Sequence, residues 1–352
     1  MNAASRWSQG LQRAWLARGL VARLLLPLSG LFAAVSALRS WSYRLGLRAT
    51  HALPVPVIVV GNLIVGGAGK TPTVIAIVSL LQQRGFKPGI VSRGYGRASE
   101  GTLDVQADTP AGLCGDEPLM LRRRTGVPVV VGRDRVAAGR ALLRAHPQVD
   151  IVLSDDGLQH LRLARDAQVL VFDERGAGNG WLLPAGPLRE RLPAAVPPRT
   201  LVLYNAASRS TMLPGLLVQR SLAGVAALGA WRAGEPTSLA ALDRLRARPL
   251  LAAAGVAQPQ RFFDLLRQHG LQFDALPLPD HFDYATLPWP AGSADVVVTE
   301  KDAVKLDPSR LGTTRVWVAA LDFALPAEFE SALVSLLPLH PLPGTDHGNP
   351  TA

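Results

Sequence analysis

The sequence of 352 residues contains one cysteine, Cys114, and no aspartate or glutamate before Glu100. A single cysteine excludes an intramolecular disulfide and a zinc site built from several cysteines. Charged residues make up only 18% of the chain and hydrophobic residues 48%, a balance too apolar for a disordered protein. We therefore expect a folded protein in which Cys114 is a small buried side chain.

The first fifty residues lack acidic side chains, and their apolar run, Leu24 to Leu38, is short. As a helix it would extend about 22 Å, less than the roughly 30 Å hydrocarbon core of a bilayer, and Pro27 and Gly30 weaken it as one continuous span. A cleavable signal peptide, a spanning helix and a core-packed helix are competing interpretations. We favour a membrane-associated helix within residues 1–50, because arginines and aromatic residues flank the run at Arg6, Trp7, Arg13, Trp15, Arg18, Arg23, Arg39, Trp41, Tyr43, Arg44 and Arg48.

Short apolar runs separated by helical stretches begin near residue 54. Nearly continuous apolar strands are typical of parallel sheets that helices cover on both faces, so the alternation predicts a doubly wound α/β domain over residues 51–205. In such sheets a ligand binds at the carboxyl ends of the strands. The expected strands are VPVIVVGN, KPGIVSRGYG, VPVVVGRD, VDIVLSDDG, AQVLVFDE and RTLVLYN.

A second, smaller α/β domain is predicted over residues 206–340, after a proline-rich passage at 181–199. The expected helix of this domain is QPQRFFDLLRQHG, which has apolar residues at helical spacing. The tail, 341–352, is expected to be disordered. The expected strands of the second domain are RPLLAAAGVA, LQFDALPLPD, ADVVVTEKD and TRVWVAAL.

The stretch VPVIVVGNLIVGGAGKTPT, residues 55–73, places a glycine-rich turn between a strand and a helix. A phosphate loop usually reads Gly, four residues, Gly-Lys-Ser/Thr, and here only the first glycine is replaced, by Ile64. Lys70 would neutralise the β- and γ-phosphates of a nucleotide, and the Thr71 hydroxyl would bind Mg²⁺. The candidate nucleotide-binding residues are Ile64, Val65, Gly66, Gly67, Ala68, Gly69, Lys70 and Thr71.

Acidic residues and one histidine follow other expected strands. Asp155 and Asp156 come directly after VDIVLS, where a nucleotide-binding sheet places its Mg²⁺-holding carboxylate; a solvated Asp-Asp-Gly turn is the alternative. Asp116 begins a helix and is either a helix cap or a general base that accepts a hydroxyl proton. His281, in the second domain, would have to reach the site across a cleft. Further candidates for contact with an anionic substrate are Asn62, Arg93, Arg97, Arg133, Arg135 and Gln159.

Eight motifs in this order resemble the tetraacyldisaccharide 4′-kinase family, the lipid A 4′-kinases of Gram-negative bacteria: VPVIVVGNLIVGGAGKTP, GIVSRGYGR, GDEP, DDGLQH, LLPAGPLRE, AGVAQPQRFFDLLRQHG, PDHFDY and VTEKDAVKL. The resemblance extends from about residue 15 to residue 325 and implies two α/β/α domains with the active site between them. The first of these is a P-loop NTPase-like domain with a parallel sheet, and a membrane-associated helix precedes it. The family's loop also lacks the first glycine.

The resemblance further implies the reaction and its residues. The γ-phosphate of ATP would pass, with Mg²⁺, to the 4′-hydroxyl of a tetraacyldisaccharide 1-phosphate, at the cytoplasmic face of the inner membrane. The family's catalytic acid falls on Asp116, its histidine partner on His281 and its metal-side acids on Asp155 and Asp156. Lys70 would also act in catalysis. The implied partners are an anionic glycolipid and the inner-membrane surface, with no nucleic acid and no obligate protein partner.

Two alternatives come from other classes of protein. GGAGKT is also similar to the loops of membrane-associated regulatory ATPases, but those often carry a lysine early in the loop, and GNLIVGG has none. The isoelectric point near 10.7 suggests a nucleic-acid binder. Its basic residues, however, gather in an apolar head that holds tryptophans, rather than along a recognisable reading module.

Overall fold

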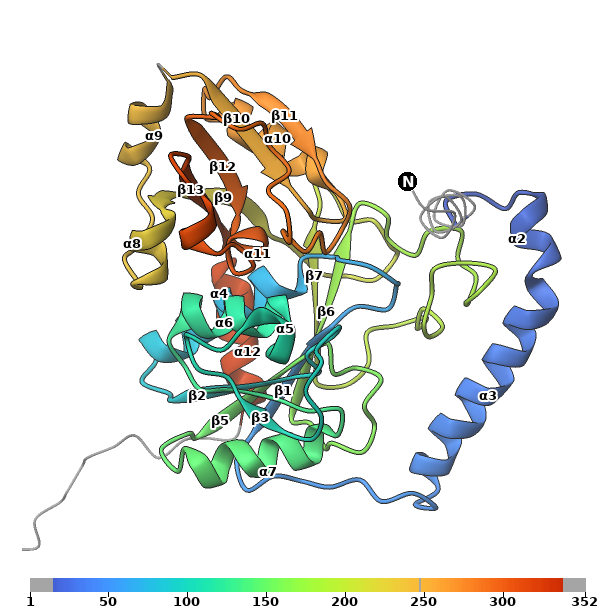
Figure 1. The fold of residues 1–352 in the computed structure, drawn as a ribbon. Coiled ribbons are helices and arrows are strands. Elements are labelled where there is room, and N and C mark those ends of the chain that lie inside the picture. Colours follow the sequence, from blue (N-terminus) through green and yellow to red (C-terminus); the bar gives the residue numbers. More distant parts are fainter. Residues whose placement is uncertain (1–14, 247, 338–352) are drawn as a thin grey trace, which may run out of the picture.

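The computed structural model describes residues 15–246 and 248–337. The chain forms two β-sheets surrounded by helices, which confirms the expected α/β class (Figure 1). The strands are β1 (Val57–Gly61), β2 (Pro88–Ser92), β3 (Leu103–Asp104), β4 (Val129–Val131), β5 (Ile151–Asp155), β6 (Ala167–Asp173), β7 (Thr200–Asn205), β8 (Leu216–Leu217), β9 (Gln219–Ala227), β10 (Leu250–Ala254), β11 (Asp274–Pro277), β12 (Asp295–Thr299) and β13 (Arg315–Ala324).

The helices connect these strands and cover the faces of both sheets (Figure 1). They are α2 (Leu20–Leu24), α3 (Leu26–Arg44), α4 (Lys70–Gln83), α5 (Ala111–Cys114), α6 (Asp116–Thr125), α7 (Arg135–Ala145), α8 (Leu228–Arg232), α9 (Ala240–Arg246), α10 (Pro259–Gln268), α11 (Glu300–Ala303) and α12 (Ala327–Leu336), with a 3₁₀ turn at Pro308–Arg310.

The first sheet has the strand order β3-β4-β2-β5-β1-β6-β7-β8 and is parallel except at β3. Alternate side chains of β1 enter different cores, because successive residues of a strand point to opposite faces. Ile58 and Val60 pack in the core that includes α4 and α6, whereas Val57 and Val59 pack in the core that includes α7. Since β1 lies at the centre of the sheet, the loop that follows it opens at the point where the strand order reverses.

The second sheet has the order β11-β10-β12-β13-β9, parallel except for β9. The first sheet extends past the expected domain boundary, because β8 pairs with β7 after residue 205. One hydrophobic core also joins the two sheets, since Phe323 and Val318 of β13 share it with Val74 and Ile77 of α4. A two-domain division of the chain therefore stays a prediction.

The amino-terminal segment forms α2 and α3 at one flank of the molecule (Figure 1). The helix breaks at Leu25, two residues before Pro27, but it continues through Gly30, so only the proline coincides with an interruption. Within the described residues, none of the helices combines the length and apolarity needed to cross a membrane. The expected head residues 1–14 and tail 341–352 lie outside the described residues.

Candidate functional site

The phosphate loop leaves β1 at Gly61 and ends where α4 begins at Lys70. Gly66 and Gly69 have φ values of 97° and 89°, in the left-handed region that glycine adopts without strain. A Cβ added to Gly69 would also lie 2.5 Å from Nδ2 of Asn205. Gly66 and Gly69 are therefore required by backbone conformation, and Gly69 also by space.

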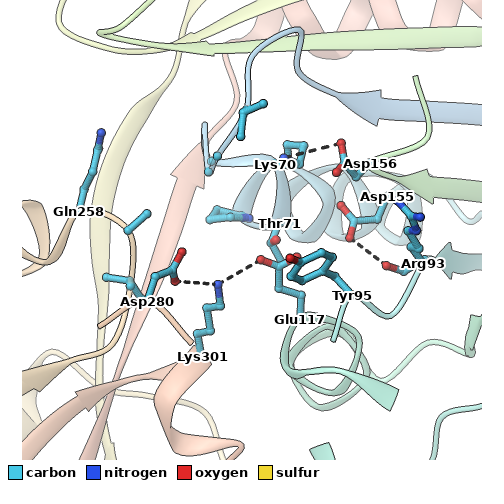
Figure 2. A pocket seen from close by; sticks show the side chains of 18 of the residues that line it. Lys70, Thr71, Arg93, Tyr95, Glu117, Asp155, Asp156, Gln258, Asp280 and Lys301 are labelled. Atoms are coloured by element: carbon cyan, nitrogen blue, oxygen red, sulfur yellow. Dashed lines mark hydrogen bonds and ion pairs between the residues drawn. The ribbon is translucent and has the colours of Figure 1, made fainter. Parts of the chain in front are cut away.

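A cavity of about 890 Å³ lies between the two sheets and reaches α3. The phosphate loop, α6 and the ends of β2 and β5 line it from the first sheet, and the second sheet contributes side chains opposite them. In Figure 2, Lys70, Asp155 and Asp156 lie on one side, while Asp280 and Lys301 approach from the other. The expected position of a site between two α/β units is thus where the structure has its cavity.

Asp155 and Asp156 lie side by side at the end of β5 but differ in environment. Asp155 is buried and accepts a 3.2 Å hydrogen bond from Ser92 Oγ; burial, together with the charge of Glu117, raises its pKa to about 7. Asp156 lies 3.7 Å from Lys70 Nζ and 3.1 Å from Arg189 Nη1. These cations outweigh its burial and lower its pKa. A solvated Asp-Asp-Gly turn does not describe this pair.

Asp116 and His281 meet across the two sheets although 165 residues separate them. His281 Nδ1 lies 3.1 Å from Asp116 Oδ2, and His281 lines the cavity. Asp116 does not cap α6, because Gly115 is its N-cap and no side chain caps that end. His281 has a φ of 59°, a strained value for a non-glycine residue that the surrounding structure must hold in place.

Lys301 connects the histidine to two carboxylates, a role that the sequence did not reveal. Its Nζ lies 3.3 Å from Glu117 and 3.4 Å from Asp280 (Figure 2). The same atom lies 3.2 Å from His281 Nε2. These carboxylates outweigh the burial of the ammonium and raise its pKa, so Lys301 is protonated at neutral pH. Lys305, one turn further on, lies 3.8 Å from Asp116. The segment TEKDAVKL therefore surrounds the Asp116–His281 pair with cations.

The candidate substrate-binding residues separate into two groups. Arg93 and Gln159 line the cavity. Asn62 and Arg133 are not among the described residues that line it: Asn62 is buried behind the phosphate loop, and Arg133 is exposed elsewhere. Arg135, a further candidate, is buried and donates to the Gly132 and Asp155 carbonyl oxygens rather than facing the cavity.

Cys114 is buried as expected, and burial raises the pKa of its thiol to about 11.

Helix α3 supplies one wall of the cavity and an exposed apolar surface. Phe32, Ser36 and Arg39 line the cavity, and the Ser29 hydroxyl donates a 2.9 Å hydrogen bond to the Leu182 carbonyl oxygen. Of α2 and α3 only Ala22 and Ser29 are buried, which contradicts a core-packed helix. We use the term apolar stripe for the side chains of α3 that are more than half exposed, namely Leu28, Leu31, Val35, Leu38 and Trp41.

The residues present fit a divalent cation that nucleotide phosphates help to hold. Asp155 Oδ1 is buried and has no hydrogen-bond partner among the described residues, and such an orphaned oxygen suits a cation. Thr71 lies near Asp155 (Figure 2). Within residues 15–246 and 248–337 no group of three or more histidine, cysteine or acidic side chains could hold a metal ion alone. Further ligands would have to come from phosphate or water, as is usual for Mg²⁺.

Comparisons with known proteins agree over most of the chain. Residues 21–338 match the sequence model of the family LpxK, tetraacyldisaccharide-1-P 4′-kinase. The tetraacyldisaccharide 4′-kinase of Methylibium petroleiphilum is 56% identical over 337 residues, 94% of each chain. That of Leptothrix cholodnii is 55% identical over 95% of this chain and 97% of its own. The crystal structure of LpxK from Aquifex aeolicus in complex with ATP has a TM-score of 0.75 and 28% identity, and it covers 90% of this chain and 100% of that one.

Proposed function

The chain belongs to the tetraacyldisaccharide-1-P 4′-kinase family, and we propose that its cavity transfers the γ-phosphate of ATP to the 4′-hydroxyl of a tetraacyldisaccharide 1-phosphate. It is a kinase of lipid A biosynthesis. The observation that carries the proposed reaction is that one cavity has the phosphate loop on one side and His281, whose Nδ1 lies 3.1 Å from Asp116 Oδ2, on the other. Donor and acceptor would meet between them.

In the proposed reaction the phosphate loop holds the donor. Lys70 Nζ lies 3.1 Å from Asn62 Oδ1 and 3.7 Å from Asp156 Oδ1, and these oxygens would orient the ammonium toward incoming phosphates. Mg²⁺, held by Thr71 and Asp155, would neutralise charge on the β- and γ-phosphates. Arg189, paired with Asp156, adds a positive charge at the same side of the cavity.

Asp116 is proposed as the general base. Its carboxylate would accept the proton of the 4′-hydroxyl as that oxygen attacks the γ-phosphorus, while the bond to the β-phosphate breaks and ADP leaves. A lysine ammonium has donors only, so His281 Nε2 must accept from Lys301, which places the imidazole proton on Nδ1. His281 then donates to Asp116 Oδ2 and leaves Oδ1 free for the hydroxyl. Lys301 thus orients the base through the histidine.

The direct test is phosphoryl transfer by the purified full-length protein in detergent micelles. With ATP, Mg²⁺ and the tetraacyldisaccharide 1-phosphate we expect the 1,4′-bisphosphate, detected by mass spectrometry. ATP turnover should depend on the lipid acceptor, which separates a lipid kinase from a regulatory ATPase acting on a protein partner. Absence of bisphosphate at high enzyme concentration would contradict the proposal.

We also propose that the apolar stripe of α3 lies in the cytoplasmic face of the inner membrane and presents the acceptor lipid to the cavity. The support is its exposure, together with the side chains of the same helix that line the cavity. The basic residues nearby, Arg39, Arg44 and Arg48, suit anionic headgroups. An exposed apolar face with arginines on the same helix suits binding at the membrane surface.

Replacing Leu31 and Leu38 of the stripe with aspartate should weaken binding to phosphatidylethanolamine–phosphatidylglycerol vesicles more than about tenfold, because each leucine would bury apolar area in the acyl boundary. Co-sedimentation measures this. The control replaces Met212 and Leu239, which are exposed outside the stripe, with aspartate. Equal vesicle binding by both double variants would contradict a membrane role for the stripe.

A further inference from the structure

Four consecutive carbonyl groups of the phosphate loop accept hydrogen bonds from three side chains that the sequence analysis did not connect. They belong to Val65, Gly66, Gly67 and Ala68. Arg175 donates to the first and third at 3.3 Å and 2.9 Å, Asn62 to the second at 3.0 Å, and Asn205 to the fourth at 3.3 Å. The donors follow or end β1, β6 and β7, three adjacent strands of the sheet. Their common position comes from the parallel order of those strands.

The amide groups of the same loop are free. Within the described residues, the backbone N–H groups of Gly66 to Thr71 donate to no acceptor. The free amides end there, because Pro72 has no N–H and the amide of Thr73 donates to Gly69 O. Of the residues from Gly66 to Thr71, all but Ala68 line the cavity. Arg175, Asn62 and Asn205 do not line it among the described residues. The carbonyl groups are therefore held at the back of the loop while its amides remain available at the front.

Arg175 is itself held by a buried acid. Its Nε lies 2.9 Å and 3.2 Å from the two carboxylate oxygens of Asp173, and its Nη2 lies 2.9 Å from Oδ2. Asp173 is fully buried at the end of β6. Because the guanidinium is planar and its donors diverge in a fixed fork, this ion pair determines where the remaining N–H groups of Nη1 and Nη2 point. They point at the loop carbonyls.

We propose that Arg175, Asn62 and Asn205 form a clamp that fixes the loop carbonyls so that the loop amides converge on the nucleotide phosphates. We define the clamp as these three residues, and each is a positioning residue. A loop rich in glycine has much conformational freedom to lose on binding, and a preformed loop avoids that cost at the moment of binding. This assigns Asn62 a role behind the loop instead of substrate contact. The inference rests on the proposed nucleotide binding at this loop.

Arg175→Ala should weaken ADP binding about tenfold or more, since two charged hydrogen bonds to the loop are lost. Calorimetric titration of the full-length protein in micelles with ADP and with AMP measures the effect, and the ratio of ADP to AMP affinity should fall, because ADP places more phosphate in the loop. Arg209→Ala is the control: this exposed arginine donates to the single carbonyl of Gly215 and does not line the cavity. It should leave both affinities unchanged.

A second pair of variants separates a clamp from simple charge. Arg175→Lys keeps the cation but loses the fork, so it should weaken ADP binding nearly as much as alanine; wild-type ADP affinity in this variant would overturn the clamp. Asn205→Ala removes one hydrogen bond and should cost a few-fold, and it decides the matter if Arg175→Ala does not fold. If the wild-type protein binds ADP no more tightly than AMP, the proposed function fails. If the wild-type protein prefers ADP and all clamp variants have the same ADP and AMP affinities as wild type, only the clamp fails.

Discussion

Asp116→Asn should lower kcat for phosphoryl transfer by about 10²–10⁴-fold while ADP affinity stays within about twofold. Asparagine has the shape of aspartate and can still accept the hydrogen bond from His281, whose Nδ1 lies 3.1 Å from Asp116 Oδ2. It cannot accept the hydroxyl proton. The residue is 16% exposed and holds no part of the phosphate loop, so the nucleotide should bind as before. Single-turnover kinetics and calorimetry measure the two effects separately.

The matched control is Asp243→Asn, which removes a carboxylate on α9 that is 66% exposed and, among the described residues, pairs with Arg246. It should have wild-type kcat and ADP affinity. The assignment of Asp116 as the general base is wrong if Asp116→Asn loses ADP binding instead of turnover, because the residue would then act on the nucleotide. Wild-type kcat in that variant would equally contradict the role.

Lys301→Met should lower kcat by about a hundredfold, with a smaller change in the KM for ATP. The lysine is the cation that lies against Glu117, Asp280 and His281 at 3.2–3.4 Å, and its loss leaves two carboxylates without that partner. Nε2 of the imidazole then has no lysine from which to accept a hydrogen bond. His281 can therefore also adopt the tautomer with its proton on Nε2, which cannot donate to Asp116. The orientation of the base is lost with the tautomer.

Nitrogen-15 NMR of labelled histidine reports the tautomer of His281 directly. We expect the proton on Nδ1 in the wild-type protein and a mixture in Lys301→Met. Lys301→Arg keeps a donor for Nε2 and should recover part of the activity that Lys301→Met loses. If the role of the lysine were purely structural, the histidine signal would be the same in Lys301→Met as in the wild-type protein. Lys87→Met, which replaces an exposed lysine outside the cavity, is the control. An unchanged tautomer in the methionine variant would contradict the role of Lys301.

Much of the fold could be predicted because parallel strands have local sequence signatures. Each of the ten expected runs contains a strand, among them β1, β5 and β12, since a buried strand must be apolar on both faces. The antiparallel edge strand β9 was missed, because its first three residues, Gln219 to Ser221, are polar and it pairs with β13 almost a hundred positions later. The pairing of β8 with β7 past residue 205 was also missed, because β8 has two residues, too few for a periodic pattern.

The candidate site was predictable to a similar degree. Asp116, His281, Asp155 and Asp156 were singled out from their places after strands or at a helix start. The structure places His281, Asp155 and Asp156 around one cavity and Asp116 in contact with His281. Their chemical roles stay predictions. Lys301, Arg175 and Asn205 gave no signal in the sequence, because a lysine or asparagine at a strand end has no distinctive spacing, and what such a residue contacts depends on distant segments.

The sequence by itself determined the donor side of this protein. A strand, a glycine-rich turn and Lys70-Thr71 at a helix start are contiguous, and their conformation follows from local φ values and helix geometry. Only the tertiary structure decided the acceptor side, where residues 165 positions apart make one hydrogen-bonded pair and Lys301 completes it. The physical reason is range: backbone preferences act between neighbours, whereas the meeting of Asp116 and His281 depends on the core that packs α4 and the second sheet together.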